Sequence, residues 1–136
     1  MKRVFAGLAL LCTTGVLAAC GGDDSSSSED PAATSSGGGQ ELKITAEEPG
    51  PEKYAFTPGS LDAKAGSVTI TMDNPSSDKI PHSVAIEGNG VNKSSEVVSP
   101  GKKAAVTADL KAGTYTFYCT VSDHRDEGME GTLKVG

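Results

Sequence analysis

Cysteine is scarce in this chain of 136 residues, which has only Cys12, Cys20 and Cys119. Cys12 lies inside an apolar N-terminal run and Cys20 lies at the end of that run, so a single thiol remains for the rest of the chain. An intramolecular disulfide is therefore excluded from any domain downstream of Cys20. In an oxidising compartment, a lone Cys119 has to be buried or bound to a metal.

Basic residues are also in the minority, with 12 Lys and Arg against 18 Asp and Glu. If Lys2 and Arg3 leave with an N-terminal leader, the remaining net charge is 10 − 18 = −8. A surface of this sign repels phosphate groups, so neither nucleic acid nor anionic lipid is expected to be a partner.

The N-terminus reads "MKRVFAGLALLCTTGVLAAC", two basic residues followed by an uncharged apolar run. This is the pattern of a secretory signal peptide, which we place at residues 1–19. A transmembrane helix needs about 20 apolar residues, and this run is shorter and ends at "CGGDD". The sequence therefore predicts export.

The end of the leader, Leu17 to Cys20, resembles the lipobox of bacterial lipoproteins, in which the Cys is acylated and becomes the first mature residue. The alternative is an ordinary small-residue cleavage site followed by an incidental Cys. Acylation of Cys20 would insert lipid chains into the bilayer and hold the protein at the outer face of the cytoplasmic membrane. Residues 21–40 contain no aromatic and no branched aliphatic residue, so residues 20–40 are predicted to be a lipidated Cys and a flexible linker.

The remaining residues, 41–136, have short apolar or Thr-rich runs separated by Pro, Gly, Asn and Asp. No stretch keeps a helical period, so the pattern predicts an all-β domain. Short strands of this number suit a two-sheet Greek-key β-sandwich. The expected strands are 41–46, 53–57, 60–65, 68–73, 82–87, 95–99, 102–110, 114–120 and 131–135.

The alternation of side chains along a strand indicates which residues face the core. In "TYTFYCT", Tyr115, Phe117 and Cys119 share one face. In "PHSVAIE", His82 shares a face with Val84 and Ile86. Both Cys119 and His82 are therefore expected on buried faces at the ends of strands.

Downstream of Cys119, the residues His124 and Met129 complete a Cys-x4-His-x4-Met pattern. A thiolate and two neutral imidazoles hold copper in a near-trigonal plane, and a long axial Met contact completes a type 1, or blue-copper, site. With His82 as the other imidazole, the chain contains each ligand type of such a site. The sequence thus points to copper and electron-transfer chemistry.

The segments "PHSVAIEG" and "GTYTFYCTVSDHRDEGMEGTLKV" resemble the cupredoxins, the plastocyanin and azurin-like blue copper proteins. The resemblance implies one type 1 copper bound by His82 and His124 through Nδ1, by the Cys119 thiolate and by Met129. It also implies that the ligand loop lies at one end of the sandwich, with the ring edge of His124 near the surface. Many relatives have Pro after the Cys and Pro-Gly before the His, where the present chain has Thr120, Ser122 and Asp123.

Each ligand also has a simpler explanation. Cys119 and Met129 can be ordinary core residues, and His82, which follows a proline, can be a turn residue. Zinc is a possible metal for Cys and two His, although the thioether favours copper. A second departure from the family is Ser83, where relatives often have an Asn that braces the Cys loop.

Enzymatic activity is not expected. Carboxylates surround the ligand loop, but they fit solvated loop charges better than a hydrolase pair, and no hydrolase or phosphate-loop motif is present. A multicopper enzyme needs further His clusters, and this chain has only two His. The carboxylates in question are Asp123, Asp126, Glu127 and Glu130.

The sequence therefore predicts a membrane-anchored, monomeric electron carrier that serves redox partner proteins outside the cytoplasm. The first alternative is a lipoprotein that stores or delivers copper. The second is a metal-free adhesion or scaffold domain.

Overall fold

A computed structural model describes residues 39–136, which form nine strands and no helix. The predicted signal peptide at 1–19, the acylated Cys20 and nearly all of the linker lie outside the described residues. The first strand begins at Gln40, one residue before the predicted start of the domain. The strands are β1 (Gln40–Gly50), β2 (Lys53–Thr57), β3 (Ser60–Ala63), β4 (Gly66–Asn74), β5 (Ala85–Gly88), β6 (Val91–Ser94), β7 (Lys102–Leu110), β8 (Gly113–Tyr118) and β9 (Glu130–Val135).

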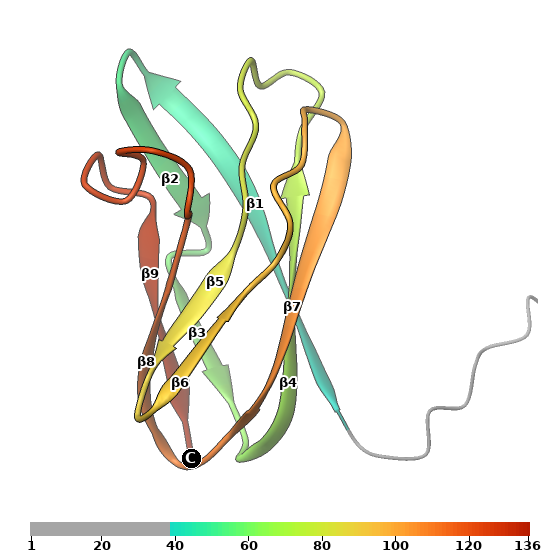
Figure 1. The fold of residues 1–136 in the computed structure, drawn as a ribbon, viewed down its shortest axis with the longest axis vertical. Coiled ribbons are helices and arrows are strands. Elements are labelled where there is room, and N and C mark those ends of the chain that lie inside the picture. Colours follow the sequence, from blue (N-terminus) through green and yellow to red (C-terminus); the bar gives the residue numbers. More distant parts are fainter. Residues whose placement is uncertain (1–38) are drawn as a thin grey trace, which may run out of the picture. The chain divides into compact units, whose positions relative to one another are not determined.

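The strands form two sheets that face each other, as Figure 1 shows. One sheet has the order β2-β1-β4-β7 and the other has the order β3-β9-β8-β5-β6. The pairs β1·β4 and β3·β9 are parallel, whereas the other pairs are antiparallel. The predicted all-β sandwich is therefore confirmed.

The core lies between the sheets because apolar residues recur at every second position of the central strands. Strand β4 buries Val68, Ile70 and Met72, and each of these residues alternates with a more exposed one. On the opposite sheet, Tyr115, Phe117 and Cys119 are all buried, which confirms the face predicted for them.

Some strand boundaries were predicted correctly and one strand was misplaced. The ranges 53–57 and 102–110 coincide with β2 and β7. The strand expected at 95–99 is wrong, because the chain re-enters the sheet earlier, as β6. The reason is a two-residue turn in which Asn89 and Gly90 have φ angles of 49° and 83°, the type of turn that Asn-Gly favours between antiparallel strands.

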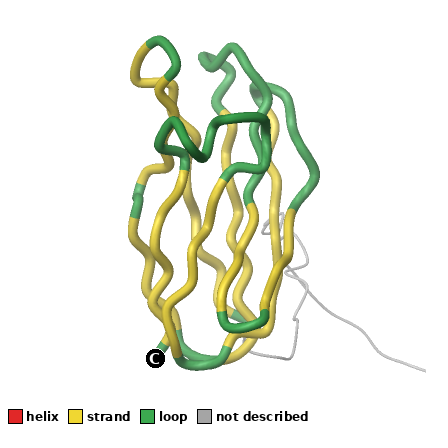
Figure 2. The backbone as a smooth tube through the Cα atoms, turned by 60° about the vertical axis from the view of Figure 1, so that its left-hand side comes forward, coloured by secondary structure: helices red, strands yellow, loops and turns green. Residues whose placement is uncertain are grey.

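The long loops gather at one end of the sandwich, opposite the C-terminus (Figures 1 and 2). At this end lie the β1–β2 turn, the β4–β5 connection and the β8–β9 connection. The β4–β5 connection carries His82, and the β8–β9 connection carries Cys119, His124 and Met129. The topology therefore brings the four predicted ligands to the same end. In residues 39–136, no helix is present that could cross a membrane.

Candidate metal centre

The β8–β9 loop is closed by backbone hydrogen bonds between its three candidate ligands. The Cys119 amide donates to the Met129 carbonyl at 3.0 Å, and the Met129 amide donates to the His124 carbonyl at 2.8 Å. Within the loop, the His124 amide donates to the Val121 carbonyl at 3.1 Å. The loop thus has a defined backbone without the prolines that many relatives use.

Arg125 fastens the same loop to the sheet. Its guanidinium pairs with Glu87 at 2.6 Å and with Glu130 at 3.0 Å, and it lies over the ring of Tyr118 at 4.2 Å. These contacts join the loop to residues of β5, β8 and β9. Glu130, one of the four carboxylates around the ligand loop, therefore forms an ion pair with Arg125.

His82 lies just before β5 rather than inside a strand as predicted. It forms an isolated bridge with Val98, with amide-to-carbonyl distances of 3.0 and 2.8 Å. The buried side chain of Asn74 donates to the carbonyls of Val98 and Ile80, at 2.9 and 3.2 Å, and so supports both sides of this bridge. Regular alternation is lost here, because Ser83 is buried as well as His82 and Val84.

The thiol and the two imidazoles converge. Cys119 Sγ is 3.6 Å from His124 Nδ1 and 4.0 Å from His82 Nδ1, and the three donor atoms all lie within 4.8 Å of one another. Bonds of about 2.0 Å to nitrogen and 2.3 Å to sulfur, as zinc makes, place such atoms about 3.7 Å apart at 120°. The spacing of the donors therefore fits one metal ion in a trigonal plane.

Met129 and His82 are fully buried, and only 1% of Cys119 is exposed. Its backbone bonds to Cys119 and His124 hold it beside both residues. A thioether in this position suits the axial contact of a copper site, since sulfur is a soft ligand.

Both imidazoles are poised to bind metal in the neutral form. Burial lowers the pKa of His82, and the neighbouring His124 lowers it further, although Glu48 opposes the shift. Burial likewise lowers the pKa of His124, against the opposing charges of Glu127, Glu48 and Asp123. A lowered pKa leaves the ring nitrogens free of the extra proton that would compete with a metal.

Ser83 contacts the Cys loop more extensively than its small size suggests. Its Oγ accepts a hydrogen bond from the Thr120 amide at 2.9 Å and lies 2.7 Å from Thr120 Oγ1. It also lies 3.8 Å from Cys119 Sγ. Ser83 and Thr120 thus form a brace next to the thiol.

His124 is the most exposed of the four predicted ligands, in keeping with a position closer to the surface than the other three. The exposed fraction of His124 is 6%, and the ring of Tyr54 packs against its imidazole at a centroid distance of 4.1 Å. Tyr54 comes from β2, a strand of the other sheet. Sequence patterns did not reveal this contact, because Tyr54 and His124 are far apart along the chain.

Two carboxylates near the site were also missed by the sequence analysis. Glu48 Oε1 lies 3.7 Å and Asp78 Oδ2 lies 4.0 Å from His82 Nε2. Burial tends to raise the pKa of Glu48, but the backbone donors Lys79 and Ile80 together with His82 outweigh it, so the pKa is lowered. The pKa of Asp78 is raised by burial and by the charges of Glu48 and Glu47.

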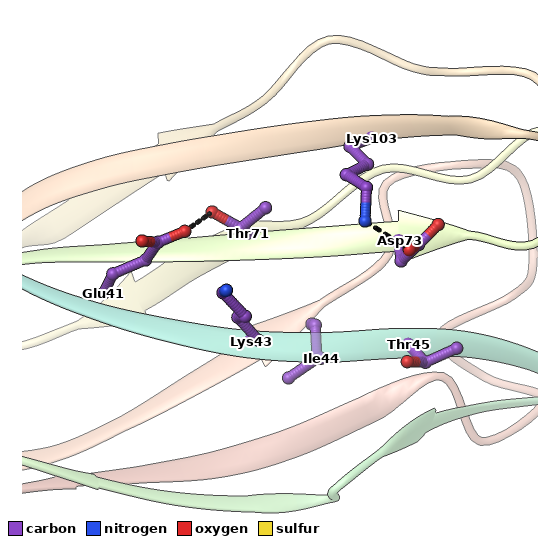
Figure 3. Close-up of a pocket in the computed structure, with 7 residues that line it drawn as sticks. All are labelled: Glu41, Lys43, Ile44, Thr45, Thr71, Asp73 and Lys103. Carbon is purple, nitrogen blue, oxygen red and sulfur yellow. Dashed lines mark hydrogen bonds and ion pairs between the residues drawn. The ribbon is translucent and has the colours of Figure 1, made fainter. Parts of the chain in front are cut away.

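A separate hollow lies along β1, β4 and β7, as Figure 3 shows. There Lys103 pairs with Asp73, and Thr71 donates to Glu41 at 3.1 Å. None of the four predicted ligands lines this hollow. The convergence of donor atoms therefore makes the loop end the candidate site.

Residues 40–136 match the family described as copper-binding proteins of the plastocyanin/azurin family. The chain belongs to this family. The cupredoxin uses copper as its cofactor, and His82, Cys119, His124 and Met129 have the arrangement of a type 1 copper site.

Individual relatives agree with this assignment. The cupredoxin is 34% identical to plastocyanin of Prochlorothrix hollandica over 94 residues, which cover 63% of this chain and 68% of that protein. It is 33% identical to plastocyanin of Nostoc punctiforme, over 60% of this chain and 64% of that protein. The structure resembles that of auracyanin B, with a TM-score of 0.60 and 21% identity over 71% of this chain and 88% of the other. The resemblance to auracyanin B shows that the two proteins share a fold.

Proposed function

We propose that this cupredoxin carries single electrons between redox partner proteins, with copper held by His82, Cys119, His124 and Met129. The observation that carries the proposal is the convergence of Cys119 Sγ with the Nδ1 atoms of both histidines in a buried site. A bound copper ion supplies a one-electron couple between Cu(I) and Cu(II). The protein's part is to hold that ion in one geometry in both states.

The residues around the donors favour a rigid site. The backbone bonds among Cys119, His124 and Met129 restrict the loop, while the bridge to Val98 restricts His82. A site that does not reorganise loses and gains an electron with a lower barrier than a flexible one. Burial of the donors also keeps water from competing for the metal.

No residue is proposed to be catalytic. A multicopper enzyme needs ligands for a second copper, and both histidines of this chain are already assigned to one site. Electron transfer then requires only transient contact with donors and acceptors. We expect the protein to act as a monomer with redox proteins as its partners.

For location, we propose that Cys20 is acylated after removal of residues 1–19 and anchors the protein at the outer face of the cytoplasmic membrane. The Gly/Ser-rich composition of residues 20–40 supports a flexible tether. A chain of about 20 such residues has a root-mean-square reach of about 25 Å. Such a tether raises the effective concentration of a membrane-bound partner without the need for a tight interface.

The alternative function is storage or delivery of copper to another protein. Four protein ligands and a covering tyrosine over His124 argue against it, because metal exchange needs an accessible ion. The two functions differ in whether the metal stays bound during turnover.

The test is to cycle the copper-loaded protein repeatedly with a redox partner and then with an apo copper acceptor. An electron carrier alternates between its coloured and colourless forms and retains its copper throughout. If the apo acceptor removes the copper within the time of a few redox cycles, the delivery function replaces the proposal. If the protein takes up no copper in the coloured form, both functions fail.

A further inference from the structure

The far side of the His82 ring faces an acidic pair, defined here as Glu48 and Asp78. His82 is fully buried, and its Nε2 has no hydrogen-bond partner. Asp78 Oδ2 is likewise buried without a partner. The two atoms are 4.0 Å apart, and Glu48 Oε1 is 3.7 Å from the same Nε2. An unpaired nitrogen and an unpaired carboxylate oxygen thus lie next to each other.

Metal binding determines which of these groups needs a partner. A neutral imidazole carries one proton, and a metal at Nδ1 leaves that proton on Nε2. The Nε2–H of His82 is then a buried donor, and burying a donor without an acceptor is unfavourable. A hydrogen bond of about 2.9 Å requires a movement of about 0.8 Å relative to Glu48. A small shift of the ring or of a carboxylate is therefore sufficient.

Glu48 is held in place for this role. The amides of Lys79 and Ile80 donate to Glu48 Oε1 at 2.8 and 3.1 Å. These bonds join β1 to the β4–β5 connection, which also carries Asp78 and His82. The acidic pair is thus part of the structure that supports His82 and is independent of the Cys119 loop.

We propose that Glu48 and Asp78 are positioning residues that accept the Nε2–H of His82, direct its Nδ1 toward Cys119 and favour Cu(II) over Cu(I). The inference rests on the proposed copper ligation by His82. A carboxylate near the ring increases the electron density on the imidazole, and its negative charge stabilises the more highly charged oxidised site. The two carboxylates come from two separate segments, Glu48 from β1 and Asp78 from the β4–β5 connection.

The proton position is tested first in the unaltered, Cu(I)-loaded protein, by nitrogen-15 NMR of the histidine side chains. We expect the proton of His82 on Nε2, with slow exchange against solvent. Rapid exchange at Nε2 would overturn the proposal, whereas a proton on Nδ1 would show that copper does not bind this atom and would refute the proposed copper ligation by His82. A protein that does not form the coloured copper site at all refutes the proposed function instead, so the two failures are distinguishable.

The bias toward Cu(II) is tested with Glu48→Gln, whose amide oxygen can still accept from Lys79 and Ile80 while the charge is lost. Glu47→Gln is the matched control, because Glu47 is the preceding residue of the same strand and is exposed. We expect Glu48→Gln to raise the reduction potential by about 59 mV, equivalent to a tenfold change in the Cu(I) to Cu(II) ratio for one electron. We also expect its Cu(II) affinity to fall about tenfold.

Asp78→Asn is the second variant and is expected to raise the potential in the same direction. Circular dichroism and copper content confirm that each variant is folded and loaded. If neither Glu48→Gln nor Asp78→Asn shifts the potential more than Glu47→Gln does, the acidic pair has no role at the copper and the inference is wrong. Should both variants fail to fold, the exchange rate of the Nε2 proton in the unaltered protein decides the question.

Discussion

The ring of Tyr54 lies against the ring of His124, with centroids 4.1 Å apart and planes inclined by 32°. The two residues belong to opposite sides of the sandwich, since Tyr54 is in β2 and His124 is in the β8–β9 loop. Aromatic pairs of this kind contribute about 0.5–1.5 kcal/mol beyond their buried area. Tyr54 therefore both orients His124 and shields it from solvent.

We predict that Tyr54→Ala speeds the loss of copper to a chelator by about three- to tenfold, because it removes the ring that covers His124 and the associated aromatic contact. Tyr54→Phe is the control, since it keeps the ring and lacks only the hydroxyl. The measurement is the decay of the visible band after addition of the chelator. Equal rates for Tyr54→Ala and the unaltered protein would show that the cover does not limit release.

Cys119→Ser is expected to abolish the intense visible band of the copper-loaded protein. The band arises from charge transfer between thiolate and copper, and a serine hydroxyl cannot supply it. Absorption and EPR spectra are the measurements, with Cys20→Ser as a control that changes a cysteine outside the ligand set. Retention of the band in Cys119→Ser would remove the copper assignment from this residue.

Met129→Leu should keep the visible band and raise the reduction potential, because the trigonal ligands remain while the axial thioether is lost. Met72→Leu is the matched control, since Met72 is also fully buried but belongs to β4. Voltammetry of the two variants gives the comparison. An equal shift in both would mean that the effect comes from core packing.

Ser83→Ala is predicted to destabilise the metal-free protein by about 0.5–1.5 kcal/mol, because the part-buried amide of Thr120 loses its acceptor. The measurement is urea unfolding. Ser94→Ala is the control, an exposed serine of β6 for which a change within about 0.5 kcal/mol is expected. A loss in Ser83→Ala no greater than in the control would mean that the brace does not stabilise the loop.

Cys20→Ala is predicted to leave the copper domain folded and to release the protein from the membrane fraction, because no other segment downstream of residue 19 is apolar enough to anchor it. Fractionation of cells followed by detection of the protein in each fraction is the measurement. Membrane retention of the Cys20→Ala protein would count against acylation as the anchor.

Local patterns in the sequence determined the β-class of the domain and the identity of the candidate ligands. The alternation in β7 and β8 is set by backbone geometry, in which successive side chains point to opposite faces. For this reason the buried position of Cys119 could be predicted correctly. The Cys-x4-His-x4-Met spacing is likewise local, because one loop carries all three residues.

The sequence alone was less informative where backbone pairing does not follow simple alternation. The Asn89-Gly90 turn placed β6 earlier than expected, and His82 is held by one bridge to Val98 rather than by a full strand. Turns and isolated bridges are determined by backbone conformation and pairing, so the alternation of apolar residues alone does not locate them.

Only the tertiary structure determined what surrounds the ligands. Tyr54 and Glu48 reach the histidines because β1 and β2 meet the β4–β5 connection and the β8–β9 loop at one end of the sandwich, whereas Asp78 lies on the same connection as His82, four residues before it. These contacts depend on which strands pair and how the two sheets face each other. Neither is encoded in the spacing of neighbouring residues. Tyr54 and Glu48 are brought to the ligands by long-range packing, whereas the Cys-x4-His-x4-Met motif is contained in a single loop.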